Sequence, residues 1–552
     1  MTTLNIGQSA LAAAQMGLDT TAHNIANAAT PGYSRQVVVQ GASIPQNLGE
    51  GFRGQGVDIA SVKRIYNDFL ATQARSAQTA KSSYDSYYMQ VRQVDNLLAD
   101  PDAGLSPVLQ GFFSSVQELS SNPASIPARQ AVLSSAEGVP SRLKSMASRL
   151  DEIGQGVNSQ ITSSVGVINT YAQELAKLND IISKLQSSTG QSPNDLLDQR
   201  DQLILDLNKE IKASVVKQGD GKYNVFVGSG QPLVVGGNTY SMAVRPSAFN
   251  PAKFEVGYQG ADGVVAIDDA SLSGGSLGGL LAFRSQSLEP AQNALGRIGI
   301  ALASTFNSQH NLGLDINGNP GSDFFVVPSP VVNSNTANTG DAEIAASISD
   351  ANALTTSDYQ LRYDDDGASQ TYSLTRLSDK QVTTYTKAVF EAGPQTVDGV
   401  TFSLATGAVA AGDSFLIRPT IKGAADFAVA ITDPAKIAAA DTDGGAGNNR
   451  NALVLGTLQT ANTMNNSTAT FQGAYSHLVS SVGNKTRELE VAGSAAGKIL
   501  TEVSQSIQSE SGVNLDEEAA NLLRYQQSYQ AAAKVMQIAN EMFQLLLSLG
   551  NN

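Results

Sequence analysis

One serine of the chain lies in the setting that nucleophilic hydrolases use. Gly274, Ser276 and Gly278 form a G-x-S-x-G pattern, and a helix is predicted directly after them, as in a nucleophile elbow. A catalytic triad would also need an acidic residue followed by a histidine, and only His310 and His477 lie downstream. Glycines flank Ser276 and no buried strand is predicted before it, so a Gly-rich turn is the favoured interpretation.

Two other segments resemble ligand-binding loops without completing either pattern. Residues 315–323 (DINGNPGSD) have the carboxylate and amide spacing of a calcium loop, but Pro320 and Val326 replace the Gly and Glu of an EF-hand. Residues 493–498 (GSAAGK) are too short for a P-loop, and Ile499 follows where Ser or Thr is needed. His23 is interpreted as a polar helix residue. We therefore expect no catalytic, cofactor or metal site.

Composition narrows the possible functions further. The chain has 552 residues, of which 15% are charged, and its formal net charge is −15; soluble domains average about 25% charged residues. It has no Cys, which excludes disulfides, thiolate metal sites and cysteine nucleophiles. It lacks a basic run, so no nucleic-acid partner is expected. Its apolar runs are far shorter than the roughly 18 residues of a membrane span, and its first basic residue is Arg35, so neither membrane insertion nor a Sec signal is expected.

The elements that would position any functional surface begin with a heptad repeat at the N-terminus. Four apolar residues recur every seven positions: Leu4, Leu11, Leu18 and Ile25. A small residue follows each of them after three positions: Gly7, Ala14, Thr21 and Ala28. Thr30-Pro31-Gly32 should end this helix, because proline restricts the residue before it and glycine permits a sharp turn.

The C-terminus repeats the pattern. Its apolar series is Leu515, Leu522, Tyr529, Met536 and Phe543, and the companion series is Glu518, Tyr525, Ala532, Ala539 and Leu546. Each terminal helix could pack on an ordinary core, but we expect the two to pair with each other and with other subunits. The two apolar series are the candidate assembly contacts. Because small residues fill half of the N-terminal seam, we expect both ends to be mobile in the monomer and to order on assembly.

Between the two ends the pattern alternates between helical blocks and β-rich segments. Periodicity predicts helices over residues 62–100, 143–185, 194–207, 277–306 and 451–508. Short strand-like runs cluster in residues 213–270 and 320–435, with a hairpin turn at residues 364–367.

Together these elements predict a multidomain α + β protein with a nested domain order. Residues 1–35 and 514–552 would form a coiled-coil-like inner domain through which the protein polymerises. Residues 36–212, 271–319 and 440–513 would form a shell of long helices packed as a bundle. Residues 213–270 would be a small β-rich insert, and residues 320–439 a larger β-rich outer insert.

The end of the first helix carries a recognisable motif. Asn24-Ile-Ala-Asn27 is followed by Thr30-Pro31-Gly32-Tyr33, which resembles the signature of bacterial flagellar axial proteins. The extension Ser34-Arg35-Gln36 resembles, among these, the hook-associated protein 1 family. Further segments resemble the same family: residues 194–201 (NDLLDQRD), 278–285 (GGLLAFRS), 306–310 (FNSQH), 313–325 and 511–536.

The resemblance implies a structural subunit of the extracellular hook–filament junction, without enzymatic activity or cofactor. Its implied partners are further copies of itself in a tubular ring, the hook protein, and the next junction protein, hook-associated protein 3. A cytosolic export chaperone would bind the C-terminal helix around residues 515–543. Export would use the flagellar type III apparatus, which takes an unfolded chain from the cytoplasm.

Several alternatives share part of this pattern. A rod, hook or flagellin-like protein is the nearest, but the Ser34–Gln36 extension and residues 306–310 argue against it. A secreted adhesin or an intracellular helical scaffold would share the low charge and absence of Cys, but neither explains heptads at both ends. If the seam mediates assembly, Leu522→Asp should give a folded monomer that cannot join the junction, because a buried charge is costly.

Overall fold

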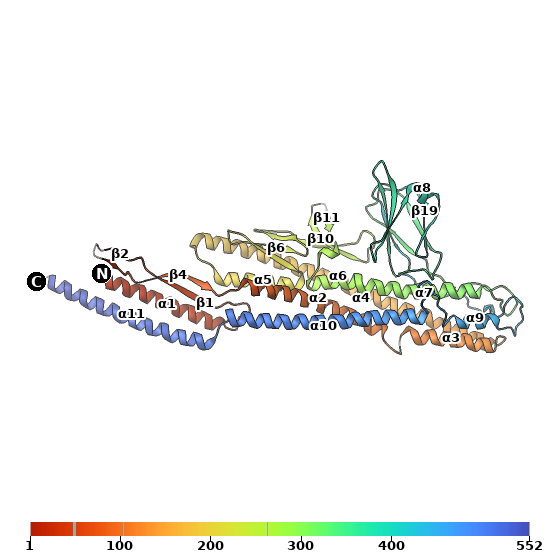
Figure 1. Ribbon diagram of the computed structural model, residues 1–552, viewed down its shortest axis with the longest axis horizontal. Coiled ribbons are helices and arrows are strands. Elements are labelled where there is room, and N and C mark those ends of the chain that lie inside the picture. The colour runs from red at the N-terminus through yellow and green to blue at the C-terminus, as the bar shows by residue number, and fades with distance from the viewer. Residues whose placement is uncertain (1, 48–50, 103, 262, 551–552) are drawn as a thin grey trace.

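Long helices run along an elongated molecule whose two chain ends lie together at one end (Figure 1). The computed structural model describes residues 2–47, 51–102, 104–261 and 263–550. The helices are α1 Thr2–Asn27, α2 Asp68–Leu98, α3 Leu105–Ser121, α4 Ile126–Thr189, α5 Asn194–Glu210, α6 Gly275–Phe283, α7 Glu289–His310, α8 Lys387–Ala392, α9 Arg450–Thr457, α10 Phe471–Ser511 and α11 Leu515–Gly550. Short 3-10 turns lie at Asp269–Ser271 and Pro434–Lys436, and a π-helical turn, Arg284–Leu288, joins α6 to α7.

The helical shell is built around α4. Ser125 caps this helix by accepting a hydrogen bond from the Ala128 N–H, and Gly190 ends it in the left-handed conformation, with φ of 68°. The apolar residues that step by three and four along α4 are buried from Leu143 to Ile182, with Leu178 half-buried. This stripe joins α2, α3, α6, α7 and α10 in one core. The predicted long helix is therefore confirmed.

Three of the predicted helical blocks differ from the structure. The helix expected from Val62 begins only at Asp68, because Val62 lies in a strand. The long helix begins at Ile126, well before Leu143, and α3 before it was not predicted. The block at residues 451–508 is interrupted between α9 and α10, where Asn465, Asn466 and Ser467 adopt positive φ angles in a tight turn.

A β-ribbon follows the first helix and was also not predicted. Strands β1 Gln36–Ala42 and β4 Val57–Arg64 pair antiparallel, from Gln36 opposite Arg64 to Ala42 opposite Val57. Strands β2 Gln46–Asn47 and β3 Phe52–Arg53 form its tip. The ribbon runs beside α1 toward the N-terminus (Figure 1).

The β-rich segments form small antiparallel sheets on one flank of the helical shell. The first segment contains β5 Ala213–Lys217, β6 Tyr223–Val227, β7 Gln231–Val235, β8 Asn238–Thr239, β9 Met242–Pro246, β10 Phe254–Gly260 and β11 Gly263–Ala266. The second contains β12 Phe325–Val326, β13 Val331–Ser334, β14 Glu343–Ile348, β15 Tyr359–Asp365, β16 Gln370–Arg376, β17 Val382–Thr386, β18 Gln395–Val397, β19 Val400–Thr406, β20 Ser414–Arg418 and β21 Ala428–Val429.

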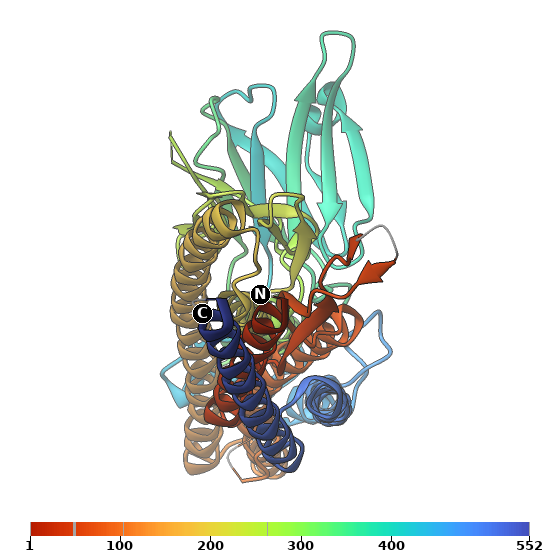
Figure 2. The same cartoon turned by 90° about the vertical axis from the view of Figure 1, so that its left-hand side faces the viewer.

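The outer β-rich segment has a core of its own. Its sheets have the strand orders β13-β20-β15-β16-β17 and β14-β19-β18. Alternate residues of β15 and β16 are buried in this core, among them Tyr359, Leu361, Tyr363 and Tyr372, and the predicted hairpin turn joins the two strands at Gly367. The segment projects sideways from the bundle (Figures 1 and 2). A mixed α + β architecture with paired terminal helices is confirmed.

Candidate assembly interface

The two terminal helices pack side by side and antiparallel (Figures 1 and 2). Gly7 of α1 faces Met536 of α11, and Gly17 faces Tyr525, so closely that a Cβ on Gly17 would lie 2.5 Å from Tyr525 Cδ1. The buried side chains of α1 are short, and they are Ala13, Ala14, Thr20, Thr21 and Asn24. Close approach of the two helices therefore depends on small residues, since larger side chains would hold the backbones apart.

The structure places the predicted seam residues in different settings. On α1, the residues of the apolar series are all half-buried: Leu4, Leu11, Leu18 and Ile25. On α11, Leu522 and Met536 are half-buried, whereas Leu515, Tyr529 and Phe543 are exposed. The companion residues Glu518, Ala532 and Ala539 are buried. The companion series therefore marks the face on which α1 and α11 meet more closely than the apolar series does. A role of the apolar series in subunit contacts stays a prediction.

A second apolar surface of α11 was not predicted. It is exposed to solvent and consists of Val535, Ile538, Met542, Leu545 and Leu549, with exposed fractions from 41% to 72%. We call it the outer stripe. Its spacing of three and four residues is visible in the sequence, but the seven-residue series selects the neighbouring face. Between residues 525 and 550 the only charged residues are Lys534 and Glu541, so this part of α11 is suited to contact with another apolar surface.

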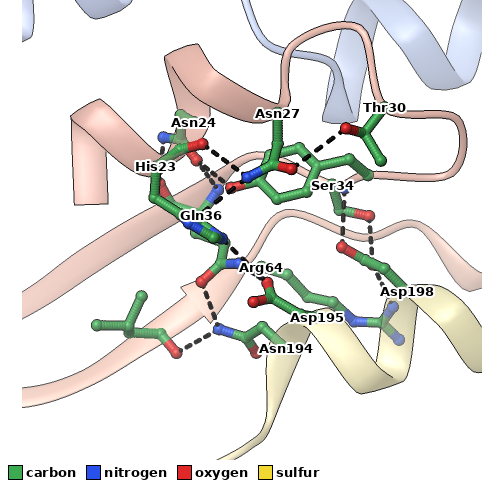
Figure 3. Close-up of polar contacts among 12 residues, drawn as sticks. His23, Asn24, Asn27, Thr30, Ser34, Gln36, Arg64, Asn194, Asp195 and Asp198 are labelled. Carbon is green, nitrogen blue, oxygen red and sulfur yellow. Dashed lines mark hydrogen bonds and ion pairs between the residues drawn. The ribbon is translucent and has the colours of Figure 1, made fainter. Parts of the chain in front are cut away.

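The motif at the end of α1 holds the helix pair to the rest of the molecule, and Figure 3 shows the polar side chains that take part. Asn24 makes four of the hydrogen bonds. Its Oδ1 accepts hydrogen bonds from the Gln36 N–H at 2.9 Å and from the Tyr33 hydroxyl at 2.8 Å. Its Nδ2 donates to the Gln36 carbonyl at 2.9 Å and to Oε2 of Glu518 at 3.2 Å. The amide thereby pairs with the first residue of β1 as a neighbouring strand would.

The start of α5 supplies a second set of partners for the motif. The Ser34 N–H and Oγ–H both donate to the Asp198 carboxylate, at 2.9 and 2.8 Å, and Arg64 of β4 donates to the same group at 2.7 Å. The Gln36 side chain donates to Asp195 at 2.7 Å and accepts from Asn194 at 3.1 Å. These contacts connect residues 34–36 to residues 194–201 (Figure 3).

Arg35 connects the motif to the bend between α10 and α11. Its Nε donates to Oε1 of Glu518 at 2.7 Å and its NH1 to Oε2 of Glu517 at 2.8 Å. Its backbone N–H donates to the carbonyl of Ser511, the last residue of α10, at 2.8 Å. One residue therefore contacts both helices that meet at this bend.

The loop between α1 and Ser34 is shaped by local contacts. Asn27 donates to the His23 carbonyl at 3.1 Å and accepts from the Thr30 hydroxyl at 3.2 Å. Pro31 is exposed, and Gly32 has a φ of 78°, with its Cα facing the Gln202 side chain. Glycine is favoured at this position because other residues rarely adopt that conformation.

Burial and neighbouring charges shift the pKa of two groups of this motif region, the Tyr33 hydroxyl and the Asp198 carboxyl. Burial, together with the negative charges of Asp195 and Asp198, raises the pKa of the Tyr33 hydroxyl, so this group donates its proton to Asn24. Burial also raises the pKa of the Asp198 carboxyl, and the hydrogen bonds from Ser34 and Arg64 oppose that shift. Asp195, Asp198 and Glu518 lie in segments that resemble the same family as the motif, residues 194–201 and 511–536. No local pattern, however, pairs them or Arg64 with the motif.

The nucleophile-elbow serine, the calcium-like loop and His310 all make hydrogen bonds within the fold. Ser276 lies at the start of α6, with its hydroxyl 3.4 Å from that of Ser86. In the calcium-like loop, Asp315 Oδ1 accepts the N–H groups of Asn317 and Asn319, which makes it a hydrogen-bonded turn. His310 is buried, with Nδ1 2.6 Å from the Ser322 carbonyl and Nε2 accepting from the Ala438 N–H at 2.8 Å.

Across residues 2–47, 51–102, 104–261 and 263–550, no group of His, Asp and Glu side chains is arranged to hold a metal ion. Within the same ranges, no helix combines the length and apolar character that crossing a membrane requires.

Comparison with protein families relates four segments of the chain to the flagellum. Residues 91–325 match the flagellar hook-associated protein FlgK helical domain, and residues 333–419 match the D2-like domain of flagellar hook-associated protein 1. Residues 4–33 match the flagella basal body rod protein family, and residues 504–549 match the C-terminal family of the flagellar basal body rod FlgEFG proteins. The terminal helices are thus shared with other flagellar families.

Full-length relatives give the same result. The chain is 39% identical to flagellar hook-associated protein 1 of Escherichia coli strain K12, over 99% of both chains. It is 40% identical to the protein of that name from Salmonella typhimurium, again over 99% of both. The solved structure of the flagellar hook junction protein FlgK from Burkholderia pseudomallei matches with a TM-score of 0.73 and 30% identity, over 79% of this chain and 99% of that one. The chain therefore belongs to the flagellar hook-associated protein 1 family, non-enzymatic structural proteins of the hook–filament junction.

Proposed function

We propose that this protein joins the hook to the filament by assembling into a tubular ring through α1 and α11, outside the cell. The observation that carries the proposal is the outer stripe of α11. In the single chain this stripe is exposed, although its residues are as apolar as those of a protein core. A stripe of this kind is stabilised when another subunit covers it.

The end of α11 supports the same proposal. Gly7 of α1 faces Met536, so the remaining N-terminal turn of α1 ends near residue 540 of α11, and α11 continues past it (Figure 1). Phe543 and Leu546 continue the two seam series but are 49% and 68% exposed, because α1 no longer covers them. A neighbouring subunit would complete the seam there.

The proposed partners follow from the position of the junction. Copies of this protein would form the ring, with the hook protein on one side and hook-associated protein 3 on the other. The cytosolic chaperone would cover residues 515–543 before export, and a neighbouring subunit would replace it afterwards. Export of the unfolded chain through the type III apparatus is consistent with the absence of Cys, since no disulfide has to be reduced before threading.

A charge in the outer stripe tests the proposal. Ile538→Asp should leave the monomer folded, because Ile538 is 46% exposed, and should prevent incorporation at hook ends. Gln544→Asp is the matched control, because it adds the same charge on an exposed polar position of α11 outside the stripe. Immunogold labelling of isolated hooks, with circular dichroism of the monomers, gives the readout. Normal incorporation of the Ile538→Asp protein would contradict the proposal.

Ile538 is a sharper position for this test than Leu522. Leu522 is half-buried in the seam region of α11, so Leu522→Asp would disturb both the pairing of α1 with α11 and the subunit contacts. The loss of incorporation expected for Leu522→Asp stays a prediction, and it would have two causes. Ile538→Asp isolates one of them, because it changes the outer stripe and not the seam.

A further inference from the structure

Helix α11 and the β-ribbon lie on different sides of α1 (Figure 2), and each carries exposed apolar side chains. Those of α11 form the outer stripe. Those of the β-ribbon lie at its tip, where Ile44 is 90% and Phe52 is 76% exposed. Both lie beside the N-terminal end of α1, because the Val57 N–H of the ribbon donates to Ser9 Oγ at 3.3 Å while Gly7 faces Met536 of α11.

The ribbon tip has the composition of a contact surface. From residue 36 to residue 57 the only charged residues are Glu50 and Arg53, and the strand residues Val37, Val38 and Val39 are β-branched. Exposed large apolar side chains on a nearly uncharged ribbon are unusual for a surface that stays in water. The described residues of this chain leave Ile44 and Phe52 uncovered.

We propose that the ribbon tip of one subunit docks on the outer stripe of α11 in the next copy. The inference rests on the proposed function and names the surfaces that meet. Because the two surfaces belong to elements on different sides of α1, each copy offers one surface to each neighbour. Such a heterologous contact continues around a ring or tube, whereas a single self-complementary patch would close after two copies.

Charge favours this pairing over an apolar contact alone. Glu541 lies on α11 between Ile538 and Leu545, at helical spacings of three and four residues, and Arg53 stands next to Phe52 on the ribbon tip. The last turn of α11 carries no basic residue. A cation that approaches this part of α11 is attracted by the carboxylate of Glu541.

Cross-linking in assembled junctions tests the contact, because the chain has no Cys of its own. Cells that produce both Phe52→Cys and Leu545→Cys chains should yield a dimer adduct when isolated hook ends are treated with a short bismaleimide. Each variant alone should yield none. Replacing Leu545→Cys with Gln544→Cys, one residue along on another face of α11, should also abolish the adduct.

The outcomes separate this inference from the proposed function. Junctions that contain both variants but give no adduct would overturn the inference alone, as would an adduct from Phe52→Cys or Leu545→Cys by itself. Absence of the wild-type chain from the hook ends would overturn the proposed function and the inference with it.

A charge exchange gives a second readout that does not depend on cysteine. Arg53→Glu should lower incorporation in competition with wild type about two- to fivefold, the range of an exposed ion pair. Glu541→Arg should do the same, and the double variant should recover wild-type incorporation. If the double variant is at least as impaired as the two single variants, Arg53 and Glu541 do not meet and the proposed docking is wrong.

Discussion

Nε of Arg35 lies 2.7 Å from Oε1 of Glu518, a residue that is only 1% exposed and stands 483 positions away in the chain. Glu518 belongs to the first turn of α11, and the backbone N–H of Arg35 donates a hydrogen bond to the carbonyl of Ser511 in the last turn of α10. The ion pair therefore sets how the terminal helix pair leaves the helical shell. Asn24 is the second donor to the same carboxylate.

Arg35→Ala should destabilise this connection by on the order of 3 kcal/mol, because it leaves a buried carboxylate without its cation. Arg149→Ala is the control: it breaks an ion pair with Glu152 in which both side chains are more than half exposed, and should change stability by less than about 0.5 kcal/mol. Urea unfolding and elastase cleavage near residues 512–514 give the readouts. Equal behaviour of the two variants would show that Arg35 does not hold the bend.

Asn24→Asp should be more harmful than Asn24→Ala, although aspartate is closer in shape. The Asn24 Nδ2 donates to the Gln36 carbonyl and to Glu518. An aspartate would place an acceptor against both of these oxygens and a second negative charge beside Glu518, whereas alanine only leaves them short of a donor. Thermal unfolding of the two variants decides the order. A more stable Asn24→Asp protein would mean that the two donations contribute little.

The periodic parts of this fold could be predicted because their signal is local. The buried stripe of α4 and the paired faces of α1 and α11 follow from the spacing of residues within one helix. The β-ribbon was missed although Val37, Val38 and Val39 are typical strand residues, because its second strand ends inside a stretch that also fits a helical pattern, from residue 62 onward.

The contacts that hold the Asn24–Gln36 motif to the rest of the molecule could be predicted only in part. The motif from Asn24 to Gln36 is contiguous, so the sequence alone indicates its importance. Its partners lie far away in the chain, and the sequence does not identify them. Glu518 lies 494 positions from Asn24, and Asp198 lies 164 positions from Ser34. Nothing in the local sequence pairs such residues, because folding of the whole chain brings them together. The outer stripe was missed for another reason: its spacing is visible in the sequence, but the seven-residue series selects the neighbouring face of α11.

Gly17→Ala should weaken the pairing of the terminal helices. A helical Gly→Ala change usually stabilises a protein by about 0.5–1 kcal/mol, but at Gly17 the added Cβ would meet the Tyr525 ring at 2.5 Å. Gly111→Ala in α3 is the matched control, because no heavy atom lies within 4 Å of its Cβ position. Incorporation at hook ends in competition with wild type should fall for Gly17→Ala and not for Gly111→Ala. Equal incorporation of both would argue against close packing at Gly17.

Acid should destabilise the helical shell through His310. Burial lowers the pKa of His310 to about 4, from an ordinary value of 6.5. The unfolded chain therefore binds more protons between these values, so stability that is present above pH 6.5 is lost as the pH falls toward 4, by about 3 kcal/mol. Urea unfolding of His310→Gln should show a flatter dependence over this range, and the exposed His477→Gln should keep the wild-type slope. An unchanged slope in His310→Gln would exclude this histidine as the cause.

The terminal helices should gain most of their order on assembly. The α1 face that meets α11 consists mainly of Gly, Ala and Thr, so pairing within one chain removes little apolar surface from water. The outer stripe stays exposed in the paired helices and adds no stability to them. In the dilute monomer, the amides of residues 5–28 should exchange with solvent much faster than those of the buried α4 stripe. In assembled junctions the same amides should become protected, since neighbouring copies would cover both helices. Strong protection of residues 5–28 in the monomer would contradict this prediction, because the pair would then be stable without a neighbour.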